Sequence, residues 1–282
     1  MPLDPDLFLS HPPIETRQRI TPNKVMLYAL GVGATELPFV YEEGLKALPG
    51  MAVIMAYPGF IWRDPKLGVD WKKILHGETS ITCHAPLPTS GELTGSSTFG
   101  PIIDKGAAKG AVVYQTREIH AEDGTHVATV RNATFLRGDG GFGGSSEGQP
   151  APHPIPDRAP DIVHALTTAE NQALIYRLSG DMNPLHVDPA VAQAAGFPRP
   201  ILHGLCTFGI AGRALLAALG DNEPERIRRI DARFSAPVFP GETIVTEIWR
   251  EGDGPDGGSA AFRCKVAERD LVVLNNGYVE FQ

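Results

Sequence analysis

The sequence predicts an α+β protein made of two diverged copies of one unit, each an antiparallel sheet wrapped around a buried helix. Two pairs of segments indicate the duplication: YALGVG at 28–33 resembles YRLSGD at 176–181, and APLPTSGE at 85–92 resembles APVFPGE at 236–242. The offsets are 148 and 151 residues, and the order along the chain is the same. In both copies, helical signals come first and strand signals follow.

A Gly- and Pro-rich segment separates the two copies. Residues 137–160 read RGDGGFGGSSEGQPAPHPIPDRAP and contain few side chains that would build a core, which is the composition of a linker. We therefore expect a first unit at 1–136, a linker at 137–160 and a second unit at 161–282.

Helix signals are clearest in the second unit. Thr167 and Glu170 have the spacing of a capping box and predict a helix that starts there. Asp188 and Pro189 supply an N-cap and a first-turn proline for a short helix. Residues 202–219 are apolar on nearly all sides, so we expect a buried helix in this segment.

Strand signals are alternating or β-branched runs bounded by Gly-rich turns. The expected strands of the first unit are Leu93–Phe99, Ala111–Ala121 and Thr125–Leu136, with a turn at 122–124. Those of the second unit begin around Ile230 and at Thr243–Trp249, continue after a loop at 252–258, and end with Leu271–Phe281.

Composition excludes several classes of function. The net charge of −8 over 282 residues argues against a broad nucleic-acid surface. The three cysteines are scattered, which makes a disulfide framework improbable. The chain begins without a secretory signal pattern and contains no apolar run long enough for a membrane span. A cytoplasmic location is therefore the expectation.

The segment YRLSGDMNPLHVDP, at 176–189, places Asp181, Asn183 and His186 in one loop. A carboxylate and an imidazole that share one water can deprotonate it and deliver a proton elsewhere. Gly204 opens the apolar helix, where unpaired backbone N–H groups and the helix dipole favour developing negative charge. These groups match the needs of water addition to an enoyl thioester. The simpler interpretation is a structural turn, because Asp and Asn often bond their own backbone.

The order of motifs makes a family resemblance visible. LSGDMNPLHVDP followed by AGFPRPILHGLCTFG resembles the signature of the MaoC-like, R-specific enoyl-CoA hydratases, the hydratase-2 family. YALGVGA, ILHGE at 74–78, GDGGFGG at 138–144 and ARFSAPVFPGET at 232–243 resemble the hydratase domain of peroxisomal multifunctional enzymes. The resemblance covers residues 10–282 and implies a double hot-dog fold, each half an antiparallel sheet around a central helix.

The resemblance also implies roles for individual residues. Asp181 and His186 would be the catalytic dyad, Asn183 would support the water, and the Gly204 amide would bind the thioester oxygen. The remaining substrate contacts that it implies are His76, Gly77, Lys105, Met182, Pro184, Leu185 and Phe234. It further implies an acyl-CoA substrate, no additional cofactor and a homodimer.

The first copy lacks the catalytic residues. Aligning Tyr28 with Tyr176 places Gly33 opposite Asp181 and a proline, Pro38, opposite the histidine. We therefore expect one active site per chain and a first half free to accommodate longer or bulkier acyl chains.

Three other functions compete with this interpretation, and two more are disfavoured. A thioesterase or a carrier-protein dehydratase would use the same fold, and a non-catalytic acyl-CoA binding module would need no dyad. A dehydrogenase is disfavoured because no strand–GxGxxG–helix unit is visible. Metal binding is disfavoured because His186 and Asp188 form a pair and not a ligand set.

Overall fold

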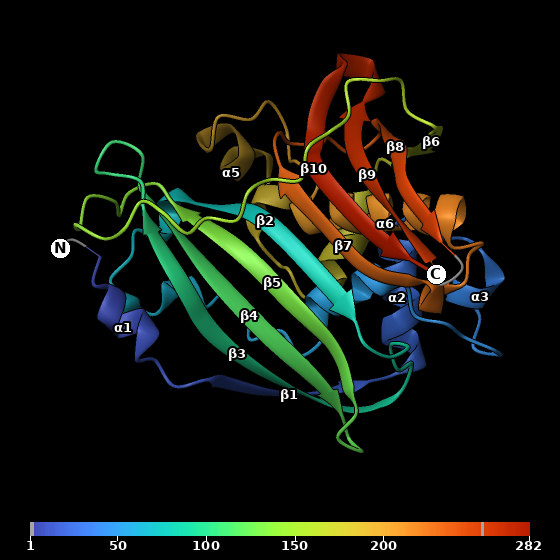
Figure 1. Cartoon of the computed structure of the whole chain (residues 1–282), viewed down its shortest axis with the longest axis horizontal. Coiled ribbons are helices and arrows are strands. Elements are labelled where there is room, and N and C mark those ends of the chain that lie inside the picture. Colours follow the sequence, from blue (N-terminus) through green and yellow to red (C-terminus); the bar gives the residue numbers. More distant parts are fainter. Residues whose placement is uncertain (1–2, 255–256) are drawn as a thin grey trace.

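The computed structural model describes residues 3–254 and 257–282, and within them ten strands form one antiparallel sheet (Figure 1). The order across the sheet is β1-β3-β4-β5-β2-β7-β10-β9-β8-β6. The first half contributes β1 (Ile14–Ile20), β2 (Ile74–Cys83), β3 (Gly91–Asp104), β4 (Ala111–Ala121) and β5 (His126–Leu136). The second contributes β6 (Ile162–Thr167), β7 (Ile227–Phe234), β8 (Thr243–Gly254), β9 (Gly257–Val266) and β10 (Leu271–Phe281).

The strand order is symmetric about its centre. Reading outward from β2 and β7 gives β5, β4, β3, β1 on one side and β10, β9, β8, β6 on the other, so each strand has a counterpart in the second half. β2 and β7 pair directly, with Ile81 opposite Ile230, and join the halves into one sheet. The duplicated α+β architecture is therefore the double hot-dog that the sequence predicts.

The long helix α6 (Gly204–Leu219) is the central helix of the second half and packs against the concave side of its sheet (Figure 1). Most of its residues are buried, as the apolar run predicts. The other α-helices are α1 (Pro5–Leu9), α2 (Pro22–Gly31), α3 (Leu37–Val40), α4 (Gln172–Tyr176) and α5 (Pro189–Ala194). The 3-10 segments are η1 (Pro49–Ile54), η2 (Ile61–Arg63), η3 (Pro65–Leu67), η4 (Trp71–Lys73), η5 (Arg177–Ser179), η6 (Pro184–His186), η7 (Pro224–Arg226) and η8 (Ala267–Arg269).

The first half has no long central helix within the described residues. The place that α6 occupies in the second half, ahead of the inner strand, is taken by η1 and a strap at residues 55–73 that contains η2, η3 and η4. Proline and glycine recur through this stretch and prevent a longer helix. η1 packs directly on α6, where Gly50 lies against Gly209.

Several sequence-based boundaries need correction. His76 and Gly77, expected above only as substrate contacts, lie inside β2. The capping box at Thr167 does not form, since Thr167 ends β6 and Asn171 occupies the N-cap of α4. β1 and β6, the two edge strands, were not predicted. Part of the expected loop at 252–258, residues 255–256, lies outside the described residues.

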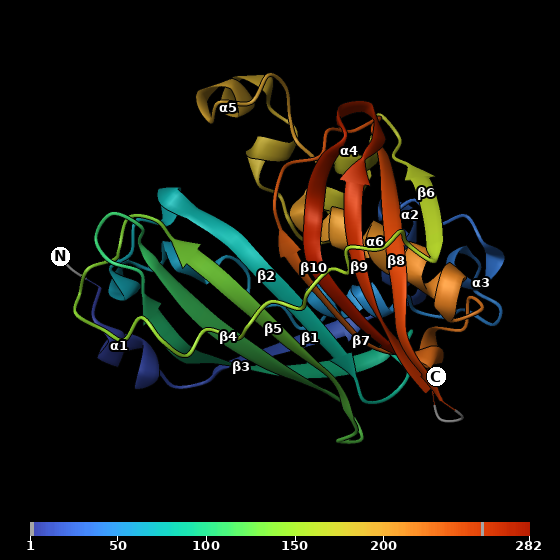
Figure 2. The ribbon, with the colours of Figure 1, turned by 45° about the horizontal axis from the view of Figure 1, so that its top comes forward.

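Residues 137–161 contain no helix or strand and cross from the first half to the far edge of the second, where β6 begins (Figure 2). Side chains fix this linker: Asp104 accepts from the amides of Gly141 and Gly143, and Trp249 donates to the Arg158 carbonyl. Among the described helices, none has the length and apolar character needed to cross a bilayer.

Candidate active site

The loop that follows η5 holds the predicted catalytic residues in a chain of local hydrogen bonds. The Asp181 carboxylate accepts from the Asn183 amide at 3.1 Å, and Asn183 Oδ1 accepts from the Leu185 amide at 3.1 Å. This second bond caps η6, the turn that ends at His186. Asn183 therefore shapes the loop, which is the more local of the two roles expected for it.

His186 is buried, with 8% of its surface exposed. Its Nδ1 lies 2.8 Å from the Ile201 carbonyl oxygen, so Nδ1–H donates there and Nε2 carries the free lone pair. Polar atoms of Asp181, His186 and His203 all lie within 4.8 Å of one another, although Asp181 itself is exposed. A carboxylate at the surface and an unprotonated imidazole nitrogen beneath it can hold one water between them.

His203, to which the sequence assigned no catalytic role, belongs to the same cluster. Its ring stacks on His186 with centroids 3.7 Å apart and planes inclined by 26°. Its Nε2 lies 3.1 Å from the backbone oxygen of Asp181 and donates to it. Its position directly before the α6 helix start was the available sequence signal, since a residue there must face the catalytic loop.

Burial controls the charge of both histidines. Desolvation is the main cause that lowers the pKa of His186, and Arg177 lowers it further, while the Ile201 hydrogen bond and Asp181 act in the opposite direction. Desolvation also lowers the pKa of His203, with the neighbouring His186 adding to the effect. Both rings are therefore neutral at pH 7, and His186 is available as a base.

The stacked geometry does not suit a metal ion. Imidazole lone pairs lie in the ring plane, and nearly parallel rings do not direct two lone pairs at one ion. The Nε2 of His203 is also occupied by the Asp181 carbonyl. In the cluster of Asp181, His186 and His203, the Nδ1 of His186 and the Nε2 of His203 are therefore both engaged by backbone carbonyls.

Gly204 begins α6, and no hydrogen-bond partner for its N–H is found among residues 3–254 and 257–282. A Cβ atom at this position would lie 3.2 Å from the ring of Phe234. The glycine therefore leaves the helix N-terminus open toward the neighbouring loop, where a free amide can stabilise negative charge.

The pairing of β2 with β7 brings residues of the first half to this site. His76 on β2 and Phe234 on β7 are in edge-to-face contact, with ring centroids 4.8 Å apart. His76 Nε2 lies 2.6 Å from Thr79 Oγ1, and the charge of Asp181 acts on the ring. Gly77 sits at an irregularity between β2 and β5, and a side chain there would meet the Ala133 carbonyl at 3.0 Å.

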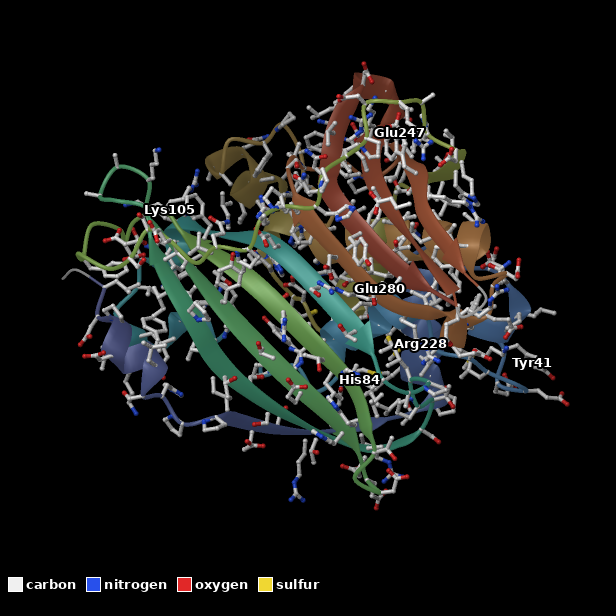
Figure 3. All side chains as sticks on the ribbon, viewed as in Figure 1. Tyr41, His84, Lys105, Arg228, Glu247 and Glu280 are labelled. Carbon is white, nitrogen blue, oxygen red and sulfur yellow. The ribbon has the colours of Figure 1, made fainter. Side chains whose placement is uncertain are left out.

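The other expected substrate contacts divide into two groups. Met182, Pro184 and Leu185 belong to the catalytic loop, and Met182 is 57% exposed. Lys105 lies in the β3–β4 connection at the far end of the first half (Figure 3). Among the described residues it makes no contact with the dyad, so its role as a phosphate contact stays a prediction.

The ten-stranded sheet and the central helix α6 define a double hot-dog fold. Two family models cover the chain: one described as "MaoC like domain" matches residues 152–268, and one described as "MFE-2 hydratase 2 N-terminal domain" matches residues 19–138.

Curated relatives extend the match to the whole chain. The chain is 47% identical to 3-hydroxyacyl-thioester dehydratase Y of Mycobacterium tuberculosis, over 93% of its own length and 92% of the relative's. It is 38% identical to the peroxisomal enoyl-CoA hydratase 2 of Arabidopsis thaliana, over 98% and 95%. The crystal structure of a MaoC-like dehydratase from Phytophthora capsici superposes with a TM-score of 0.90 at 35% identity and covers 99% of both chains.

The chain belongs to the MaoC-like hydratase-2 family, whose members are enoyl-CoA hydratases 2 and 3-hydroxyacyl-thioester dehydratases. It is an enzyme, a hydro-lyase that acts on acyl thioesters.

Proposed function

We propose that the enzyme hydrates 2-trans-enoyl-CoA reversibly to (3R)-3-hydroxyacyl-CoA, with Asp181 and His186 as its catalytic dyad. The observation that carries this assignment is the free Nε2 of His186, held neutral and aimed at the loop that carries Asp181. The R stereochemistry follows from the family resemblance.

Each step of the reaction has a candidate group. A water between Asp181 and His186 loses a proton as it attacks C3, and the proton added at C2 comes from the same pair. Negative charge develops on the thioester oxygen and is stabilised by the Gly204 amide at the start of α6, a contribution of about 3 kcal/mol. In the reverse direction, the same groups remove the proton and the hydroxyl.

The acyl chain would extend toward the first half, where, within the part of the chain that the structure describes, η1 and the strap stand in place of a long central helix. We propose that medium, long or bulky chains are accepted for this reason. Residues His76 and Phe234 would line the entrance, because they form a contact between the halves on which the charge of Asp181 acts.

The test is loss of absorbance of the conjugated thioester with crotonyl-CoA and 2-trans-decenoyl-CoA, with the product's chirality measured. We expect Asp181→Asn and His186→Ala each to lower kcat at least about 100-fold. Asp188→Asn is the matched control: it removes the same charge seven positions along the chain, and asparagine still caps α5.

Wild-type activity in either dyad variant would contradict the assignment of the dyad. Release of free coenzyme A from a saturated acyl-CoA, with no hydration of either enoyl substrate, would establish a thioesterase. Turnover restricted to four-carbon substrates would overturn the proposal on chain length.

We also propose a homodimer. Three leucines on α2, α4 and η5 are half exposed, Leu30, Leu174 and Leu178, and such a patch is typical of an interface. Light scattering should give twice the 30.3 kDa chain mass. The double variant Leu174→Glu and Leu178→Glu should have the mass of the monomer, and a monomeric wild type would contradict the proposal.

A cytoplasmic location is proposed from the sequence, and cell fractionation tests it.

A further inference from the structure

A row of polar side chains crosses the concave face of the first half, where apolar residues are expected. On β4, Ala111, Val113 and Ile119 face inward and belong to hydrophobic clusters. Strand alternation places Arg117 on the same face, between those clusters. Arg117 is 4% exposed, and its partner in the β3 register, Ser97, is also 4% exposed.

The guanidinium of Arg117 is only partly satisfied. Its Nη2 donates to the Ala52 and Val53 carbonyls at 3.2 and 2.8 Å and thereby holds η1 against the sheet. Its Nε is buried without a hydrogen-bond partner, and no carboxylate forms an ion pair with it among the described residues. The ring of Tyr57 lies over the guanidinium at 5.5 Å. A buried charge with unmet donors is costly unless something else binds it.

A second orphaned group faces the same place. The Ser97 hydroxyl is buried and has no partner among the described residues. Arg117 and Ser97 contribute to the lining of a cavity of about 30 Å³ under the strap, together with Tyr57, Trp62, Gln115 and Asn132, and Arg117 Nε and Ser97 Oγ lie just behind its surface. This volume accommodates about two water molecules or one small polar substituent.

The cavity lies beside the catalytic cluster. Asn132, in its wall, has its Oδ1 3.2 Å from Nε2 of His76. Tyr57, in the opposite wall, is under the influence of both Asp181 and Arg117. A chain entering past His76 would therefore reach the cavity with its distal end.

We propose that this cavity is a subsite for the tail of the acyl chain, and that it selects tails carrying an oxygen acceptor, either a carboxylate or a hydroxyl. The inference rests on the proposed hydratase function. A substrate oxygen would accept from Arg117 Nε and from the Ser97 hydroxyl. Both atoms have almost no accessible surface in this structure, so Tyr57 in the strap would have to shift to admit the oxygen. A terminal methyl group would satisfy neither donor.

The structural role of Arg117 does not account for the whole arrangement. Only Nη2 of Arg117 donates to the carbonyls of η1. Nε of Arg117 and the hydroxyl of Ser97 have no part in holding η1 and no hydrogen-bond partner among the described residues. Burial lowers the pKa of Arg117 to about 10, so the group is still a cation at neutral pH. An anionic or strongly polar tail supplies the missing partner.

The experiment compares 2-trans-enoyl-CoA substrates of six to twelve carbons whose tails end in methyl, hydroxyl or carboxylate. For the wild type, we expect kcat/KM for an oxygen-bearing tail to exceed that of the equally long methyl substrate about 10- to 100-fold at one chain length. The carboxylate and hydroxyl series separate a charge requirement from a hydrogen-bond requirement.

Arg117→Met, which keeps the length of the side chain, should bring that ratio to one or reverse it. Ser97→Ala should lower the ratio by a smaller factor. Arg17→Met, on the exposed side of β1, is the control and should keep the wild-type ratio.

A wild-type preference for methyl tails at every length would overturn the inference. Because this measurement needs no variant, the inference can be tested even if Arg117→Met does not fold. An unchanged ratio in a folded Arg117→Met enzyme would overturn it as well. Absence of any crotonyl-CoA hydration by the wild type would instead be a failure of the proposed function.

Discussion

His186 stacks on His203 with ring centroids 3.7 Å apart, and each ring donates to a backbone carbonyl of a different segment. His186 is fixed by Ile201, directly ahead of α6, and His203 is fixed by Asp181 in the catalytic loop. His186, which lies in the catalytic loop, donates to the segment before α6. His203, which lies directly before α6, donates to the catalytic loop. The pair therefore sets where Asp181 and the free Nε2 of His186 lie relative to each other.

His203→Phe should lower kcat about 10-fold with little change in KM. Phenylalanine preserves a ring in the stack but removes the N–H that holds the Asp181 carbonyl, a loss of about 1 kcal/mol or more. The measurement is steady-state kinetics with crotonyl-CoA, alongside thermal unfolding. His203→Gln, which retains a donor, should recover part of kcat; equal kcat in wild type and His203→Phe would show that the ring only packs.

The pH dependence of kcat/KM should show its acidic limb below pH 6.5. His186 acts as a base only when neutral, and burial lowers its pKa, so it stays neutral until the pH falls below its ordinary value. Because the Asp181 charge raises the pKa of His186, the residual activity of Asp181→Asn should have its limb at still lower pH. A limb at or above pH 7 in the wild type would refute a buried neutral base.

Two glycines of α6 should respond oppositely to alanine. A Cβ at Gly209 would lie 2.6 Å from Val32 Cγ1 and 2.7 Å from the Tyr28 hydroxyl, so the packed segments must separate. At Gly212 the nearest atom, Ile230 Cδ1, is at 3.5 Å, an ordinary contact. Gly209→Ala should reduce the free energy of unfolding by about 1–3 kcal/mol, and Gly212→Ala should raise it by up to about 1 kcal/mol.

Urea denaturation of the two variants measures both changes under identical conditions. Gly212→Ala controls for the gain in helix propensity that both substitutions share. Equal stabilisation by the two would mean that the close approach of α6 to α2 does not constrain the fold.

The sequence predicted the parts of the fold that depend on local pattern. The limits of β4 and β10 match the expected Ala111–Ala121 and Leu271–Phe281, because both are runs rich in apolar and β-branched residues that follow a turn. α6 was equally clear, since an apolar run of that length has few alternatives. The capping box at Thr167 failed because the β6–β8 pairing takes that residue into the sheet.

The site was predictable only in part. Asp181, Asn183 and His186 share one loop, so sequence proximity revealed them. His76 and Phe234 come into contact only because β2 pairs with β7, and no local sequence pattern predicts that pairing. Arg117 did leave a signal, because alternation along β4 assigns a charged residue to the apolar face, but its partners come from η1 and β3.

Gly204→Ala tests the open start of α6. The added methyl would lie 3.2 Å from the Phe234 ring, so either the ring or the helix end must move, and the amide would no longer be presented to the thioester. We expect kcat/KM to fall at least about 10-fold with only a modest loss of thermal stability. Adding Phe234→Leu should relieve the contact and restore part of kcat if crowding is the cause. If Phe234→Leu restores no kcat, the loss in Gly204→Ala is due to the displaced amide and not to crowding. Undiminished activity in Gly204→Ala would exclude this amide as the group that stabilises the thioester oxygen.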